Sequence, residues 1–394
     1  MTHVAKGHKR IRVDVAKPLL QWAMDRSGKS VGELARKPDL VNLNEWITGT
    51  KKPTMKQLEG FARATYTPFG HLLSSKPPSE HPLPIPHFRT INDGAPPSPS
   101  LNLQDAIRII QQRQEWVRDY LIEVGAEPLG FVGAGSVGDD PVDVANSMRN
   151  ALELDSNWAV HHPTWEKAQK YLYAQMEEKR IFVSKNTMVQ NNHSRPLDYN
   201  EFRGFVLVDE YAPFVFVNGA DIAGAQMFTV AHELAHIWMG KSASFDLRNL
   251  AADPANKLET ACNKIAAEFL VPTEELHLHW NGFNSNSDDP YKEASARFKV
   301  SRIVAARRAL DVKLISQAEF DDFYLKQRQQ KNRPKKKKGG PRFDALVPYR
   351  ISKRFLRTAI GAVREDRLLY RDAYFLTGLR PTTFERISNR IYDA

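Results

Sequence analysis

The stretch FTVAHELAHIWMG, Phe228–Gly240, holds two histidines four residues apart, with a glutamate directly after the first. Residues four apart lie on the same face of an α-helix, so a helix here would present the His232 and His236 imidazoles side by side. Two such imidazoles can bind one metal ion, and Glu233 beside them can act as a general base toward water. The alternative is an amphipathic helix that spells the motif by chance, because HExxH alone is only moderately specific.

Two further features favour a metal site. The helix has a separate apolar stripe, so its packing does not require the histidines; the stripe is Val230, Leu234, Ile237 and Trp238. A second predicted helix, LETACNKIAAEFLVP, supplies Glu259 as a candidate third ligand, 23 residues after His236. Asn263 follows one turn later on the same face, where it can hydrogen-bond a ligand imidazole.

Strands are predicted just before this helix. RIFVS is followed by a hairpin-like pair, RGFVLVD and PFVFVN, separated by EYAP. We expect PFVFVNG to form a strand edge that holds an extended peptide by main-chain hydrogen bonds. Helical patterns surround the strands, at about 103–124, 141–178, 221–239, 256–271 and 288–310.

The two helices together resemble the ImmA/IrrE family of zinc metallopeptidases, whose pattern is HExxH, a spacer and then ExxAN-x-FA-x-x-LLxP. FTVAHELAHIWMG and ETACNKIAAEFLVP follow it, with departures at Cys262, Ile265 and Val271. The departures are small or apolar residues at packing positions. A thiol near a metal could sense redox state, but a small buried side chain is the simpler interpretation of Cys262.

The resemblance implies a zincin-like domain that binds one Zn²⁺ ion. It assigns His232, His236 and Glu259 as the metal ligands and Glu233 as the catalytic base. Asn263 would support a ligand by a hydrogen bond to its imidazole. A binding-only relative would be free to lose the base, and this chain retains it, which favours a catalytic protein.

The N-terminal segment is predicted as a run of short helices. Ser30 and Glu33 form a capping box at the start of one helix, and Thr54 and Gln57 form another. Between them lies NLNEWITG, with Asn42 as its expected N-cap. The segment NEWITGTKKPTMKQLEGFA resembles XRE-type helix-turn-helix domains, which implies that the second helix of the unit enters the major groove of DNA.

The candidate DNA-contacting residues surround this helix. Asparagine can bind adenine, and lysine or arginine can bind phosphate; the candidates are Asn42, Asn44, Arg36, Lys37, Lys51 and Lys52. A protein-docking module is the alternative, because Glu45 and Trp46 are not base-reading residues.

Length and composition limit the class of protein. A chain of 394 residues suggests two or three domains, and a net charge of +10 with pI near 9.4 favours an anionic partner, nucleic acid before membrane. A single cysteine excludes an internal disulfide and fits a reducing compartment. No apolar leader or membrane-length apolar stretch is present, so we expect a cytoplasmic protein with no membrane partner.

The predicted fold class is α+β, mostly α. The predicted domains are a helix-turn-helix domain at 1–73, a Pro/Ser-rich linker at 74–102, the metallopeptidase domain of helices and a small sheet at 103–325, a basic linker at 326–342 and a small helical module at 343–394. The basic linker contains nine Lys or Arg and no acid.

The expected function is a zinc-dependent endopeptidase fused to a DNA-binding domain. Members of the resembling family cleave repressor-like transcription factors, and others are encoded beside toxins or within mobile elements. The implied substrate is therefore a repressor-like or antitoxin-like protein, and a toxin or another neighbouring-gene product is a further expected partner. The alternative is a non-catalytic DNA-binding antitoxin or regulator that uses the peptidase fold to bind a partner.

Overall fold

The structure is a computed structural model, and it describes residues 11–78, 99–245, 257–286, 289–329 and 343–392. Most of the predicted Pro/Ser-rich linker and of the basic linker lies outside the described residues. The chain divides into two compact units. The N-terminal unit comprises Met1–Pro82 with Ser98–Gln104, and the large unit comprises Leu83–Pro97 with Asp105–Ala394.

The N-terminal unit is helical. Its elements are α1 (Lys17–Ser27), α2 (Val31–Ala35), η1 (Pro38–Leu40), α3 (Leu43–Thr48), α4 (Met55–Thr65) and η2 (Phe69–Leu73). Both predicted capping boxes are present, Ser30 with Glu33 at α2 and Thr54 with Gln57 at α4. Asn42 is the N-cap residue of α3 as predicted, but its side chain makes no capping hydrogen bond.

The large unit is built around a small mixed sheet. Its strands are β1 (Phe182–Asn186), β2 (Gly204–Leu207), β3 (Phe214–Asn218) and β4 (Ala243–Phe245), in the order β1-β3-β2-β4. β1 runs parallel to β3, whereas β2 is antiparallel to both β3 and β4. The fold is thus mostly helical with a small sheet, as predicted from the sequence.

The prediction that PFVFVNG forms a sheet edge is wrong. β3 pairs with β1 on one side and with β2 on the other, so its main-chain groups are used within the sheet. All five residues of β3 are buried. An uninterrupted apolar strand without charged residues is typical of a central position, because edge strands need charges, prolines or bulges to prevent further pairing.

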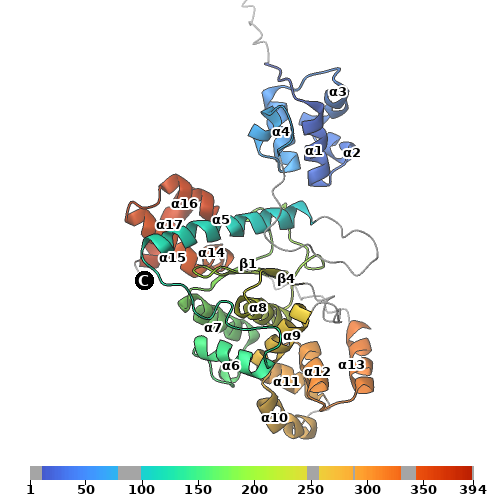
Figure 1. The fold of residues 1–394 in the computed structure, drawn as a ribbon. Helices are drawn as coiled ribbons and strands as arrows, with labels where there is room; N and C mark the ends of the chain where they lie inside the picture. The colour runs from blue at the N-terminus through green and yellow to red at the C-terminus, as the bar shows by residue number, and fades with distance from the viewer. Residues whose placement is uncertain (1–10, 79–98, 246–256, 287–288, 330–342, 393–394) are drawn as a thin grey trace, which may run out of the picture. The chain divides into compact units, whose positions relative to one another are not determined.

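Helices cover both faces of the sheet (Figure 1). One face is covered by α5 (Leu101–Glu123) together with α14 (Phe343–Ile351), α15 (Lys353–Arg364), α16 (Tyr370–Thr377) and α17 (Pro381–Tyr392). The other face is covered by α6 (Pro141–Ala151), α7 (Trp165–Glu178), α8 (Ala223–Trp238) and α9 (Lys257–Leu270), with η3 (Trp158–His161) between α6 and α7. No described helix is long and apolar enough to cross a membrane.

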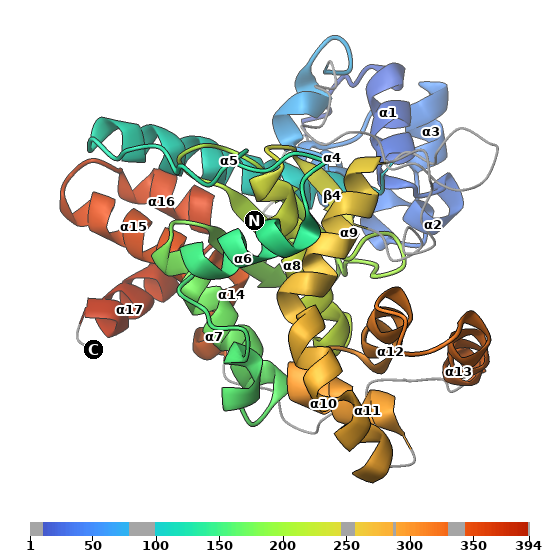
Figure 2. The ribbon, with the colours of Figure 1, turned by 60° about the horizontal axis from the view of Figure 1, so that its bottom comes forward.

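Four helices continue from α9 away from the sheet (Figure 2). They are α10 (Thr273–Asn286), α11 (Pro290–Phe298), α12 (Arg302–Asp311) and α13 (Gln317–Gln329). A buried ion pair between Arg308 and Glu268 ties α12 to the end of α9. Thr273 Oγ1 donates to the same carboxylate at 2.7 Å, so the polar groups at this helix junction are satisfied.

The C-terminal helices dock on the large unit through polar contacts with α7. Ser352 Oγ, fully buried, donates to Glu177 Oε1 at 2.6 Å, and Arg354 Nη1 donates to the Glu177 carbonyl at 2.6 Å. Burial raises the pKa of Glu177, although hydrogen bonds from Ser352 and the start of α15 oppose the shift. The region predicted as a small helical module is therefore integrated with the sheet and α7.

Candidate metal centre

Helix α8 carries the candidate site and lies in the interior of the large unit. Residues 224–238 are all buried, which explains why the helix is apolar on most of its circumference. Val230, Leu234 and Ile237 are 0% exposed and form the predicted packing stripe with Trp238. Gly240, at φ +65°, adopts the left-handed conformation that ends the helix.

Helix α9 lies beside α8 and brings Glu259 to the two histidines. His232 Nε2 is 3.1 Å from Glu259 Oε2, and His236 Nε2 is 3.3 Å from Glu259 Oε1. The two Nε2 atoms are 3.1 Å apart. Both histidines are 0% exposed, and the Glu259 side chain is 16% exposed. The structure therefore brings together the three predicted ligands from two helices, α8 and α9.

The donor atoms fit a tetrahedral ion. Zinc bonds of about 2.0–2.1 Å to nitrogen or oxygen place neighbouring donors of a tetrahedron about 3.3 Å apart. The two Nε2 atoms, 3.1 Å apart, are separated by about one edge of such a tetrahedron, and each lies within 3.3 Å of one carboxylate oxygen of Glu259. Two imidazoles and one carboxylate are also a donor set found at catalytic zinc. His232, His236 and Glu259 could therefore hold one metal ion.

The electrostatics of the three residues suit a cation. Burial lowers the pKa of His232, and interactions with Glu259 and Asn263 oppose this shift only in part. The imidazole is thus held toward its neutral form, which is the form that binds metals. Burial alone would raise the pKa of Glu259, but hydrogen bonds and charge interactions with His232 and His236 hold that pKa well below its usual range. Glu259 therefore stays ionised.

Glu233 is fully buried and faces the sheet where β2 has a glycine. A Cβ atom placed on Gly204 would lie 3.4 Å from Glu233 Oε1, 2.5 Å from Thr229 Cγ2 and 2.9 Å from the Phe216 carbonyl oxygen. Only glycine permits this close approach of β2 to α8. Gly204 was not identified from the sequence, and the only signal for it is a glycine inside the otherwise apolar strand segment RGFVLVD.

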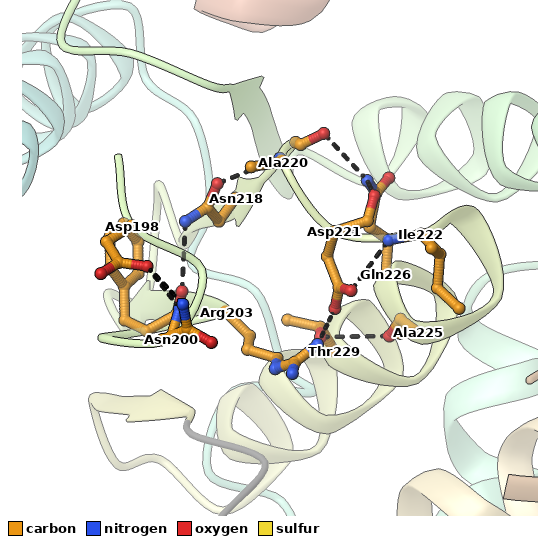
Figure 3. Close-up of polar contacts among 12 residues, drawn as sticks. Asp198, Asn200, Arg203, Asn218, Ala220, Asp221, Ile222, Ala225, Gln226 and Thr229 are labelled. Atoms are coloured by element: carbon orange, nitrogen blue, oxygen red, sulfur yellow. Dashed lines mark hydrogen bonds and ion pairs between the residues drawn. The ribbon is translucent and has the colours of Figure 1, made fainter. Parts of the chain in front are cut away.

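Polar contacts hold the start of α8 against the ends of β2 and β3 (Figure 3). Arg203, just before β2, forms an ion pair with Asp221, just before α8. Gln226 Nε2 donates to the Asp221 carbonyl at 2.6 Å. Asn218, the last residue of β3, accepts the N–H of Ala220 at 3.1 Å. These contacts were not predicted, because they join segments whose proximity depends on the strand order.

Two residues of α9 next to the ligands have different roles. Asn263 lies close enough to His232 to raise the pKa of its imidazole, against the larger effect of burial. Its Oδ1 atom and His236 Nδ1 are buried without a hydrogen-bond partner among the described residues. Burial first, and the Glu259 and Glu233 charges second, raise the pKa of the Cys262 thiol. This favours the interpretation of Cys262 as an inert packing residue.

The candidate DNA-contacting residues lie around α2 and α3 of the N-terminal unit. Arg36, Lys37 and Asn44 are exposed, and Asn42 is half-buried. Lys51 Nζ lies 3.1 Å from Glu45 Oε2, and Lys52 Nζ lies 2.7 Å from Asp14 Oδ2. The two lysines are therefore already paired within the unit, whereas no ion pair is seen for Arg36 or Lys37 in the described part of the chain.

The comparisons with known proteins place the site within a recognised domain. Residues 170–310 match the IrrE N-terminal-like domain. This domain belongs to the peptidase M78 family model, and the matched segment extends from α7 to α12, including all three candidate ligands. The match covers about a third of the chain and shows a likeness of this segment to the domain. Residues 351–390 match a domain of unknown function (DUF8813), and no curated protein or solved structure matches the chain.

Proposed function

We propose that this chain is a zinc-dependent endopeptidase joined to a DNA-binding unit. The observation that carries the proposal is the convergence of His232 Nε2, His236 Nε2 and the Glu259 carboxylate, in which each nitrogen lies within 3.3 Å of a carboxylate oxygen. The IrrE N-terminal-like match over 170–310 supports it independently of the geometry. The substrate is a repressor-like or antitoxin-like protein, and the DNA-binding unit brings the peptidase to the region of DNA that this protein controls.

The residues of the chain have distinct roles in the proposed reaction. A zinc ion held by His232, His236 and Glu259 would supply Lewis-acid activation of water and of the peptide carbonyl. Glu233 accepts a proton from the water as its oxygen attacks the carbonyl carbon, forming a C–O bond. Glu233 then donates that proton to the amide nitrogen as the C–N bond breaks. Asn263 keeps the His232 ring oriented toward the ion.

The second candidate function is a non-catalytic regulator that binds DNA and a partner protein, such as a toxin. One observation favours it: His232, Glu233 and His236 are all 0% exposed. Among the proposed ligands and the base, only the Glu259 side chain, at 16%, is partly exposed. The presence of the general base favours the peptidase, because binding alone does not require Glu233.

One experiment distinguishes the two functions. It compares the N-termini of all cellular proteins between cells that produce the wild type and cells that produce Glu233→Gln. The peptidase predicts new N-termini of a small set of proteins with the wild type only, since removal of a general base slows cleavage by about 10²–10⁴-fold. Glu274→Gln, on an exposed residue of α10, is the matched control and behaves as the wild type. Identical N-termini for all three proteins, at equal zinc content, would establish the non-catalytic regulator instead.

A further inference from the structure

Helix α16 presents an aromatic face that the large unit leaves uncovered. One side of the helix is buried through Ala373, Leu376 and Thr377. On the other side Tyr370 is 55% exposed and Phe375 is 65% exposed, and the N-cap residue Leu369 is 64% exposed. Arg371 and Tyr374 lie between Tyr370 and Phe375 around the helix. We call Leu369, Tyr370, Arg371, Tyr374 and Phe375 the α16 face.

The two tyrosine rings of the α16 face are held in place by α17. Phe384, which is 1% exposed, packs edge-on against Tyr374 at 5.5 Å and against Tyr370 at 6.4 Å between ring centroids. Tyr370 and Tyr374 are themselves 6.1 Å apart. Because the edge contacts fix the rings, binding a flat ligand on the exposed surfaces costs little side-chain entropy.

The net charge of the C-terminal helices favours a polyanion. Residues 343–392 contain ten Lys or Arg against five Asp or Glu. The Arg371 side chain is 85% exposed, and Arg380 at the start of α17 is also exposed. Two acids are close: Asp372 Oδ1 lies 3.2 Å from Arg371 Nε, and Glu385 contributes to the raised pKa of Tyr374. The exposed guanidinium of Arg371 can still bind a phosphate through its outer nitrogens.

We propose that the α16 face binds single-stranded nucleic acid, with bases stacked on Tyr370 and Phe375 and phosphates bound by Arg371 and Arg380. Exposed rings next to arginines are the arrangement that binds single strands without sequence preference, because every base offers a flat π-surface. A duplex does not fit, since its bases are already stacked. This activity is separate from the metal centre and from any duplex binding by the N-terminal unit.

The test measures binding of the full-length chain to a fluorescein-labelled oligothymidylate of about 20 nucleotides, by anisotropy, in about 0.3 M salt to suppress purely electrostatic binding. The double variant Tyr370→Ala/Phe375→Ala is compared with Leu325→Ala, which removes an equally exposed apolar side chain (59% exposed) from α13. Both sites are exposed, so the fold should be retained, and circular dichroism checks this.

We expect the double variant to bind roughly tenfold more weakly or worse, since stacking is worth about 1–3 kcal/mol per base. Its salt dependence should be unchanged, because no phosphate contact is removed. Arg371→Ala should instead reduce the slope of log K against log salt by about 0.7. Phe375→Trp, which retains a stacking surface, should bind as well as the wild type. Leu325→Ala should have no effect.

Three results would overturn the proposal. The first is equal affinity of the double variant and Leu325→Ala for the oligonucleotide. The second is equally effective competition by polyglutamate, which has the charge but no bases and would indicate an acidic protein partner. The third is a wild-type dimer that the double variant converts to a monomer, which would make the α16 face an interface between two copies of the chain.

Discussion

Gly204 occupies the point of closest approach between β2 and α8. The strand backbone lies against Thr229 and Glu233 there, and the space for a side chain is already filled by Thr229 Cγ2 and the Phe216 carbonyl. The position of the proposed general base is therefore set from two sides, by its own helix and by the strand beneath it. The proposed ligands and base act through their side chains, but the position of Glu233 depends on Gly204, which has no side chain.

Substitution Gly204→Ala should destabilise the large unit by roughly 1–3 kcal/mol, the usual range for overpacking a core. Thr229→Ser removes the methyl group that the new Cβ would meet at 2.5 Å, so the double variant Gly204→Ala/Thr229→Ser should recover part of the loss. Urea unfolding measures the effect. Gly282→Ala, in α10 with open space around its Cβ position, is the control. A Gly204→Ala variant as stable as this control would contradict the account.

Residues whose role depends on local spacing could be predicted from the sequence. His232 and His236 are one helical turn apart in any α-helix, and Ser30 with Glu33 needs only four consecutive residues to form a capping box. Gly204 could not be predicted, because its importance arises from a strand and a helix that meet only in the folded chain. Glu177 was missed for the same reason, since its partner Ser352 is 175 residues away.

At the scale of elements, the candidate metal site depends on how α8 and the sheet are joined. The central position of β3 could not be deduced from its sequence neighbours, since β2 follows β1 in the chain but β3 lies between them. Hydrogen-bonded side chains also join the sheet to α7 and to α8. Lys185 Nζ in β1 donates to Gln169 Oε1 at 2.7 Å, and Gln169 Nε2 donates to Gln226 Oε1 at 3.2 Å. These hydrogen bonds join β1, α7 and the start of α8.

Lys185 makes the stability of this junction depend on pH. Burial lowers the pKa of Lys185 to about 8, from 10.5 in the unfolded chain. Between these two pH values the unfolded state binds more protons than the folded state, so Lys185 contributes an increase in the free energy of unfolding as pH rises from 8 to 10.5. In Lys185→Met this increase should be absent.

The measurement is urea unfolding of wild type and Lys185→Met across this pH window, with Lys167→Met, on an exposed residue of α7, as the control. The difference between wild type and Lys185→Met isolates the lysine, because all other titrating groups are shared. If the free energy of unfolding changed with pH in the same way for the two proteins, Lys185 would not be desolvated in the folded state.

At the scale of the whole molecule, the chain combines a basic helical unit with the unit that contains the candidate metal centre. Residues 11–78 contain eleven Lys or Arg against six Asp or Glu. The excess favours a polyanionic partner for this unit, and the short helix α3 is the proposed reading element. The proposed endopeptidase would thereby act close to DNA.

The ion pairs of the N-terminal unit predict unequal contributions to DNA binding. The substitutions Arg36→Ala and Lys37→Ala should each reduce the slope of log K against log salt for duplex binding by about 1. Each should also lower the affinity for all DNA sequences by the same factor. Lys51→Ala and Lys52→Ala should have smaller effects, because binding phosphate competes with their contacts to Glu45 and Asp14. Anisotropy with a labelled duplex at several salt concentrations measures this. Equal effects of all four substitutions, or none, would argue against the proposed surface.

The central claim is that His232, His236 and Glu259 form a zinc site, and metal content tests it most directly. After incubation with zinc and removal of excess ion, the full-length chain should retain one zinc ion per molecule by elemental analysis. Glu259→Ala should lose most of it, whereas Glu233→Gln and the exposed control Glu274→Ala should retain it. The account is contradicted if wild type and Glu259→Ala carry the same negligible amount of zinc.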